Sequence, residues 1–182
     1  MCTTKYIALP VQMLSREVYA LPMGLHQLAL SLESSAYTAL RSFADRKSAL
    51  PEHLLTGERG EDAAFFHLRA LGYTVVARRW RSSRIPGDLD LVAWDGSTLV
   101  IFEIKTRTAH DLASAESAVD THKQKILRKM ASAYLRQLPE PNRAAVSLRF
   151  DILSVYLLPH GTEFEHLPNA FPRIEPGTPR AR

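Results

Sequence analysis

The sequence predicts an α/β domain, because segments with the apolar spacing of an amphipathic helix alternate with short runs of β-forming residues. A strong hairpin signal, Asp95-Gly96, separates two of these runs. Gly72 and Pro139 mark the ends of the two segments with helical spacing. The expected elements are helices over residues 57–71 and 121–138 and strands over residues 73–80, 88–94, 98–106 and 147–158.

Each core element has a local signal. The first helix is closed by Gly72, and the strand that follows contains the β-formers at 74–76. The later helix starts at an N-cap, Asp120 or Thr121, and stops before Pro139. Its expected apolar stripe consists of Ile126, Met130, Ala133, Tyr134 and Leu138.

The chain divides into three parts by composition. Residues 1–55 form an N-terminal extension with one or two short amphipathic helices, and residues 56–158 form the core domain. Residues 159–182 are a proline-rich tail, expected as a loop with a disordered end. The sequence leaves open whether the extension is an accessory segment packed on the domain or whether translation starts further in, at Met13 or Met23.

Composition bounds the function classes. The 182 residues are 46% hydrophobic and 23% charged, as in ordinary globular proteins, and the net charge of +4 is compatible with a nucleic-acid partner. The single cysteine, Cys2, excludes an internal disulfide and a cysteine-based zinc site. No apolar run approaches the roughly 20 residues of a membrane-spanning helix, and no signal peptide is recognisable. The expectation is a cytoplasmic protein without a membrane partner.

Three charged residues interrupt the two apolar runs of the hairpin. Asp90 is followed after twelve residues by Glu103, and then by Lys105, a spacing typical of metal-dependent nucleases. If the loop is Asp95-Gly96 alone, Asp90 lies diagonal to Glu103; if the loop covers residues 95–98, Asp90 lies directly opposite it. Both loop lengths place the three charges on one face of the sheet.

Two carboxylates on neighbouring strands repel each other unless a cation lies between them. Oxygen ligands favour Mg²⁺ or Mn²⁺, which activate water and stabilise charge on an attacked phosphate. Lys105 would orient or deprotonate that water. The alternative is a structural salt bridge between Lys105 and one of the acids, although the apolar flanks argue against simple surface charges.

Glu61 is a candidate fourth member of this site, because it shares a helical stripe with apolar residues. Either the metal site or the positive end of the helix dipole would satisfy it, and the dipole alone explains Glu58 and Asp62.

Basic residues cluster on both sides of the hairpin in the sequence: Arg78, Arg79, Arg81 and Arg84 precede it, and Lys123, Lys125, Arg128 and Lys129 lie on the later helix. Lys123, at the start of that helix, is a candidate to point at the hairpin site. A charge run is usually a solvated face, but next to a metal site these side chains become candidates for phosphate contacts. Trp80 could stack on a base, but a tryptophan at the end of a strand is more often part of the core. Asp151 is interpreted as a structural partner of a nearby arginine. The candidate nucleic-acid-binding residues are Arg78, Arg79, Arg81, Arg84, Arg107 and Lys123.

The chain resembles the YraN family of uncharacterised bacterial proteins, which are related to restriction-endonuclease-like and Holliday-junction-resolvase-like nucleases. The resemblance covers residues 55–171. It is carried by Gly60-Glu61-Asp62-Ala63, Leu71-Gly72-Tyr73, Gly87-Asp88-Leu89-Asp90-Leu91, Phe102-Glu103-Ile104-Lys105-Thr106-Arg107, Tyr134-Leu135, Arg149-Phe150-Asp151 and His166-Leu-Pro-Asn-Ala-Phe171.

The resemblance implies a restriction-endonuclease-like core with a central mixed β-sheet flanked by α-helices. It implies catalytic roles for Glu61, Asp90, Glu103 and Lys105. The family usually has Glu where this chain has Asp88, which makes Asp88 an auxiliary residue of shortened reach.

The leading hypothesis is a Mg²⁺-dependent or Mn²⁺-dependent endonuclease that acts on DNA, including branched or damaged DNA, with Asp90 and Glu103 as metal ligands. Two alternatives stay open: a non-catalytic nucleic-acid-binding module with the same fold, and a protein-interaction role carried by residues 1–56. A homodimer is compatible with the resemblance, but no feature of the sequence predicts one.

Overall fold

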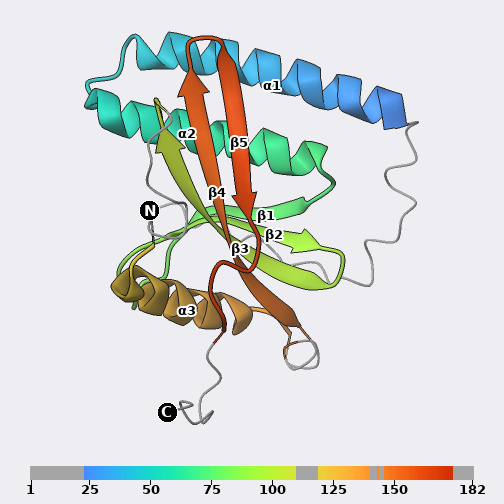
Figure 1. Ribbon diagram of the computed structural model, residues 1–182, viewed down its shortest axis with the longest axis vertical. Helices are drawn as coiled ribbons and strands as arrows, with labels where there is room; N and C mark the ends of the chain where they lie inside the picture. Colours follow the sequence, from blue (N-terminus) through green and yellow to red (C-terminus); the bar gives the residue numbers. More distant parts are fainter. Residues whose placement is uncertain (1–22, 110–118, 140–142, 144–145, 174–182) are drawn as a thin grey trace.

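The computed structural model describes residues 23–109, 119–139, 143 and 146–173 (Figure 1). In this part of the chain, no helix is both long enough and apolar enough to cross a bilayer. The helices are α1 (Met23–Asp45), α2 (Glu52–Ala70) and α3 (Thr121–Leu135), and the strands are β1 (Thr74–Trp80), β2 (Leu89–Asp95), β3 (Thr98–Arg107), β4 (Ser147–Leu158) and β5 (Gly161–Leu167).

The strands form one mixed sheet with the order β1-β2-β3-β4-β5. Strands β3 and β4 pair in parallel, and every other neighbouring pair is antiparallel. Helix α2 packs on one face of the sheet with α1 outside it, and α3 covers the opposite face (Figure 1). This confirms the expected fold class, a central mixed sheet flanked by helices.

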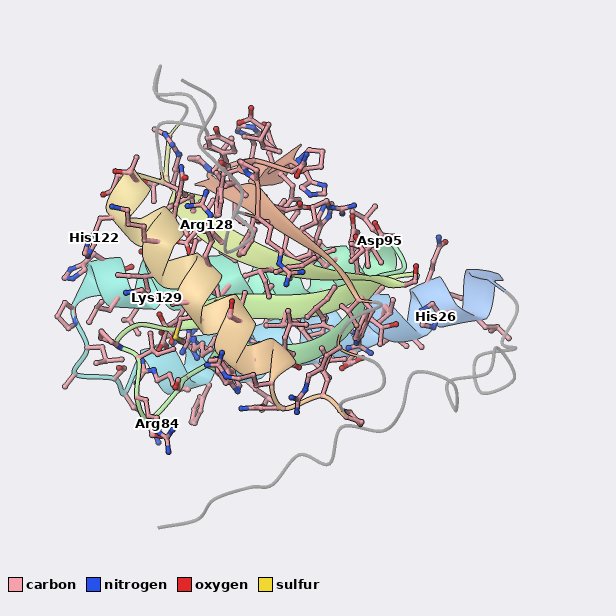
Figure 2. All side chains as sticks on the ribbon, turned by 90° about the horizontal axis from the view of Figure 1, so that it is seen from below. His26, Arg84, Asp95, His122, Arg128 and Lys129 are labelled. Carbon is pink, nitrogen blue, oxygen red and sulfur yellow. The ribbon has the colours of Figure 1, made fainter. Side chains whose placement is uncertain are left out.

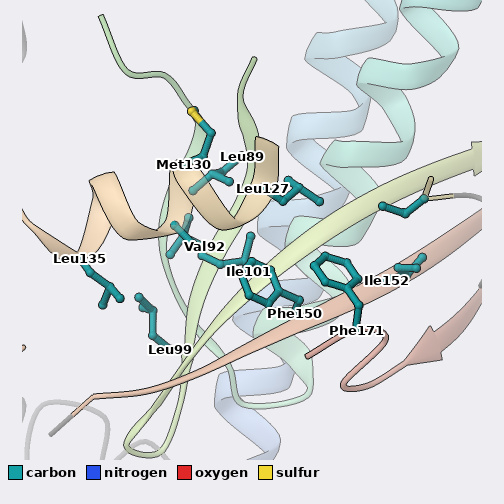
Figure 3. Packing of buried hydrophobic residues seen from close by; sticks show 12 residues of the cluster. Leu89, Val92, Leu99, Ile101, Leu127, Met130, Leu135, Phe150, Ile152 and Phe171 are labelled. Atoms are coloured by element: carbon teal, nitrogen blue, oxygen red, sulfur yellow. The ribbon is translucent and has the colours of Figure 1, made fainter. Parts of the chain in front are cut away.

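The sheet separates two apolar cores, because successive strand residues point to opposite faces. Ala64 and Leu68 of α2 pack against Leu91, Val100 and Phe102 on one face. On the other face, α3 packs against the side chains of β2, β3 and β4, and Figure 3 shows its residues over the sheet. The largest fully buried members of this second core are Leu89, Val92, Leu99, Ile101, Leu127, Met130, Phe150 and Ile152.

Helix α3 begins at the expected N-cap, since the side chain of Asp120 accepts a hydrogen bond from the Lys123 N–H at 2.8 Å. It ends at Leu135, earlier than the expected residue 138. Of the expected stripe, Met130 is buried, and Ile126, Tyr134 and Leu138 pack against the core. The buried face is centred on Leu127 and Ala131, which the expected stripe did not include. A helix with apolar residues on several adjacent positions fits more than one face, and contact with the sheet decides between them.

The expectation of a loop after residue 158 was wrong for residues 161–167, which form the edge strand β5. Gly161 has a φ of 148°, and it pairs with Leu158 where the chain reverses into β5. Because residues 159–182 are rich in proline, their composition predicted a loop in place of this turn and strand. The last nine residues, for which a disordered end was expected, lie outside the described residues, as does most of the irregular segment expected over 107–120.

Gly60 fixes the distance between α2 and β3. A Cβ atom at this position would overlap the Thr106 Oγ1 atom and lie 2.8 Å from the Thr106 Cβ atom, whereas a Cβ at Gly57 would meet no atom within 4 Å. Only glycine therefore permits this approach of the helix to the central strand.

We expect Gly60→Ala to lower the free energy of unfolding by about 1–3 kcal/mol, because the helix must move away from the strand. Gly57→Ala is the matched control, and it should be neutral or stabilise by up to about 1 kcal/mol through helix propensity. Urea unfolding measures both. Equal effects of the two substitutions would contradict the proposed close approach.

Candidate active site

The β2–β3 hairpin sets Asp90 and Glu103 opposite each other. Trp94 pairs with Leu99, which confirms the strand register expected for the longer of the two loops considered. The loop itself is shorter than expected, because Asp95 and Thr98 also pair and only Gly96 and Ser97 lie between the strands. Four residues further from the turn on each strand, the same register brings Asp90 to the level of Glu103. Side-chain alternation then directs Asp90, Glu103 and Lys105 to the face of the sheet that α3 covers.

Glu103 is the most buried charged residue of this group, with only 3% of its surface exposed. Its Oε1 atom accepts hydrogen bonds from the ammonium groups of Lys105 and Lys123, each at 3.0 Å. Its Oε2 atom is buried and has no hydrogen-bond partner among the described residues. A buried carboxylate oxygen without a partner carries a desolvation penalty, so this atom has unused capacity for a ligand.

Asp90 is held beside Glu103 by a backbone hydrogen bond. Its Oδ2 atom accepts a hydrogen bond from the Ile104 N–H at 2.7 Å. Burial raises the pKa of Asp90 to about 7, and the negative charge of Glu103 contributes to the rise, while the Ile104 N–H and the Lys123 ammonium oppose it. Near neutral pH, Asp90 is therefore partly protonated, and the two facing carboxyl groups together carry less than two negative charges. A bound cation would favour the ionised form of both.

Lys123 reaches this site from the first turn of α3. Burial lowers its pKa, but the carboxylates of Glu103, Asp90 and Asp88 outweigh burial, and the net pKa is raised. The sequence assigned Lys123 to nucleic-acid binding and made it a candidate to point at the hairpin site. In the structure, it does point there, and its ammonium group contacts Glu103, a candidate metal ligand. It joins α3 to the central strand of the sheet.

Glu61 approaches from α2, on the other face of the sheet. Its carboxylate pairs with Arg79, which also binds Glu58 at 2.9 Å. Arg79 has a φ of 47°, in the left-handed region that non-glycine residues rarely adopt. The negative charge of Glu61 nevertheless contributes to the raised pKa of Asp90. The two carboxylates therefore interact electrostatically although they do not pair.

A groove of about 690 Å³ lies between α2 and the end of β3. Glu61 and Lys105 line it together, so it borders the hairpin site. Thr56, Gly57 and Thr106, which carried no functional signal in the sequence, line it as well. The complete set of lining residues is Glu52, His53, Thr56, Gly57, Glu61, Ile104, Lys105, Thr106, Arg107, Thr108 and Ala109.

The candidate nucleic-acid-binding arginines lie in different settings. Arg78 pairs with the buried Asp62, and its guanidinium group lies 4.6 Å from the centre of the Phe65 ring. Arg81 pairs with the auxiliary residue Asp88 at 3.4 Å. Arg84 is exposed on the loop at the edge of the domain (Figure 2).

Arg78 and Arg79 are therefore engaged by carboxylates of α2, while Arg107 borders the groove. Because α2 starts at Glu52, Glu58 and Asp62 lie in its interior, and the dipole explanation for these two acids was wrong. Ion pairs hold them instead.

A second basic surface lies on the outer side of α3. Figure 2 shows Arg128 and Lys129 on this helix, and both line a hollow of about 270 Å³ with Arg136, Ser132 and Ile85. Arg128 also donates to the Pro172 carbonyl oxygen at 3.0 Å. The sequence grouped Arg128 and Lys129 but missed Arg136, which lies more than one helical turn away along the chain.

Two other interpretations from the sequence are confirmed. Asp151 is a structural residue: it is buried, Arg149 donates to it at 2.9 Å, and the Asn169 N–H donates to it at 2.9 Å. Trp80 packs edge-on against Tyr134 with 5.3 Å between the ring centres, beside the core on the α3 face.

The described residues contain no cluster of three or more His, Cys, Asp or Glu side chains arranged for a metal ion. The hairpin supplies two carboxylates, and one of them has a buried oxygen that no described residue contacts by a hydrogen bond. That donor set fits Mg²⁺, which commonly keeps several waters and uses one or two carboxylates from the protein.

Fold and site together define an α/β protein with a paired-carboxylate and lysine site on the central strand of a mixed sheet. The profile of the uncharacterised protein family UPF0102 matches residues 60–155. The chain belongs to this family, which is the YraN family of the sequence resemblance.

Curated relatives from this family are similar in sequence to the chain over most of their own length. A UPF0102 protein of Koribacter versatilis is 47% identical over 121 residues, which are 66% of this chain and 82% of the relative. One from Solibacter usitatus is 42% identical over 126 residues, 69% of this chain and 91% of the relative. One from Porphyromonas gingivalis is 37% identical over 139 residues, 73% of this chain and 98% of the relative.

Proposed function

We propose that this protein is a nuclease that hydrolyses phosphodiester bonds in DNA with Mg²⁺ or Mn²⁺. The observation that carries the proposal is the pair of facing carboxylates, Asp90 and Glu103, with a buried Glu103 oxygen that has no partner among the described residues. Two facing acids and a lysine on one face of the hairpin suit the hydrolysis of phosphodiester bonds. A purely structural ion pair would leave no buried carboxylate oxygen without a partner.

Each residue has a separate role in this proposal. Asp90 and Glu103 would hold the metal ion, with the carbonyl oxygen of Ile104 as a third ligand. The ion, when bound, lowers the pKa of a water molecule and stabilises charge on the phosphate. Lys105 would orient the attacking water, and Glu61 would complete the site after release from Arg79.

The groove beside the hairpin is the proposed path of the cleaved strand. Lys105 and Arg107 line it, and their positive charges suit a phosphate backbone. Basic residues of α3, which include Arg128 and Lys129, supply a second surface for phosphates. Contacts of this kind position a nucleic acid without reading its sequence.

The direct test is an assay of the purified protein with Mg²⁺ or Mn²⁺ on linear, flapped and four-way DNA. We expect metal-dependent cleavage of at least one substrate by the wild type and none above background by Asp90→Ala. Absence of cleavage on every substrate, or equal cleavage by Asp90→Ala, would overturn the proposal.

A second function, a non-catalytic nucleic-acid-binding module, is favoured by one observation. Lys105 and Lys123 both bind Glu103, and Arg79 binds Glu61, so cations of the protein itself already pair with these acids. Salt-dependent DNA binding together with the absence of metal affinity in calorimetry would support this function over catalysis.

A further inference from the structure

Helix α1 packs on the domain with its charged face inward. Its charged residues are Glu33, Arg41 and Asp45, and all of them pair with side chains of α2. Glu33 lies 2.8 Å from Arg69, and Asp45 lies 2.8 Å from Arg59. The usual arrangement, in which the apolar face of a surface helix meets the core, is therefore reversed.

The opposite face of α1 is apolar and exposed. Its large side chains recur at helical spacing, and they are 52–71% exposed. By contrast, Leu30 on the inward face is only 6% exposed. At 100° per residue, three alanines complete the same face. We call this surface the α1 stripe; it consists of Leu25, Leu28, Ala29, Leu32, Ala36, Ala39, Leu40 and Phe43.

The α1 stripe spans about 27 Å along the helix. Contiguous apolar surfaces of this kind are uncommon on monomeric proteins and mark interaction sites. Helix α1, which carries the stripe, lies outside α2 and forms the outer helical layer on this side of the sheet (Figure 1). The stripe is separate from the hairpin site, and α1 precedes the segment that matches the family profile.

We propose that the α1 stripe is a dimer interface in which α1 packs antiparallel against α1 of a second copy of this chain. The stripe itself contains no charged residue, so no like charges of the stripe repel each other when two copies meet. A cation, Lys47, lies 4.7 Å from the Phe43 ring centre at one end of the stripe. An antiparallel two-fold arrangement makes a single uniform stripe complementary to itself.

The area is consistent with a weak dimer. Covering five large side chains on each copy buries on the order of 1,000 Å² in total, which is near the lower limit for a specific interface. Association in the micromolar range is therefore expected. A membrane surface is a poorer occupant, because membrane-bound amphipathic helices present lysine and arginine on the polar face, and here that face is paired with α2.

The first experiment measures the mass of the full-length protein in solution by analytical ultracentrifugation between 1 and ~200 μM, a range set by the expected weak interface. We expect the wild type to reach twice the monomer mass and the double variant Leu32→Lys, Leu40→Lys to remain a monomer. Leu71→Lys is the matched control, since Leu71 is 57% exposed at the end of α2 and outside the stripe. The control should dimerise like the wild type.

A cysteine cross-link tests the geometry. In an antiparallel pair, Ala36 near the middle of the stripe lies close to its own copy. In a Cys2→Ser background, Ala36→Cys should form a disulfide-linked dimer on mild oxidation, and Leu71→Cys should not.

Several outcomes would overturn the proposal. One is a monomeric wild type at the highest concentration, and another is a dimer that persists in the double variant. A monomer whose melting temperature falls in the double variant but not in Leu71→Lys would show that the chain itself covers the stripe. A monomer that binds vesicles of phosphatidylcholine and phosphatidylglycerol through the stripe would assign it to a membrane surface. Loss of nuclease activity alone would leave the dimer result unaffected, because neither measurement uses the hairpin site.

Discussion

Replacement of Glu103 by glutamine should lower metal affinity and the rate of DNA cleavage by about 100-fold or more. Glutamine has nearly the same shape as glutamate, but it carries no charge and offers one carbonyl oxygen in place of two carboxylate oxygens. The buried Oε2 atom, which has no partner among the described residues, is the atom whose loss matters most for a ligand. Titration calorimetry with Mn²⁺ and a cleavage assay measure the two effects.

Asp95→Asn is the matched control for this substitution. It makes the same change from carboxylate to amide in the same hairpin, but Asp95 lies at the turn and pairs with Arg149 at 3.2 Å. Its metal affinity should equal that of the wild type. Unchanged Mn²⁺ affinity in Glu103→Gln, with circular dichroism showing an intact fold, would exclude Glu103 as a ligand.

Glu103→Gln also changes the contacts of Lys123. The ammonium group of Lys123 would keep a hydrogen-bond acceptor but lose a negative partner 3.0 Å away. The anchoring of the first turn of α3 to β3 should weaken, with a lower melting temperature than in Asp95→Asn. Metal loss and helix loosening are separable, because only metal loss depends on the Mn²⁺ concentration.

The hairpin site could be predicted because its geometry is local. Strand alternation and a short turn restrict Asp90, Glu103 and Lys105 to one face, and the observed register matches one of the two loops considered. Lys123 was a candidate to point at this site, but its pairing with Glu103 could not be predicted, because that contact depends on how α3 crosses the sheet. No spacing rule links the N-terminus of that helix to Glu103.

The arginines after β1 illustrate a different limit. A run of basic residues with no acid inside it is typical of a solvated or phosphate-binding face. In the structure, Arg78 and Arg79 bind Asp62, Glu58 and Glu61, which are 16–21 residues earlier in the chain. These partners meet only after α2 packs on the sheet, so a count of nearby charges could not reveal them.

The same limit applies to α1. The spacing of its leucines predicted an amphipathic helix, and an apolar stripe normally packs on the core. Ion pairs with α2 reverse that orientation, because Arg41, Glu33 and Asp45 find opposite charges on α2. Periodicity identifies the two faces of a helix, whereas the surface on which it packs determines which face is buried.

Asp90 should make the stability of the metal-free protein depend on pH. Its pKa in the folded protein is about 7, against an ordinary value of 3.8. Between these two values, the folded state holds a proton that the unfolded state has released. The free energy of unfolding should therefore fall as the pH rises from about 4 to about 7. Each unit of pKa difference corresponds to about 1.4 kcal/mol, so the effect amounts to a few kcal/mol at most.

Asp90→Asn removes this titration and keeps an oxygen that accepts from the Ile104 N–H. At pH 5, its stability should be close to that of the wild type; at pH 8, without metal, the variant should be the more stable protein. Addition of Mn²⁺ at pH 8 should stabilise the wild type, since a ligand that binds only the folded state raises its stability, and should leave Asp90→Asn unchanged. Urea unfolding at both pH values, with and without Mn²⁺, provides the measurement. Parallel stability curves for the two metal-free proteins from pH 5 to pH 8 would show that the pKa of Asp90 is not raised in the folded protein. Equal stabilisation of both proteins by Mn²⁺ at pH 8 would show that the metal site needs another acid.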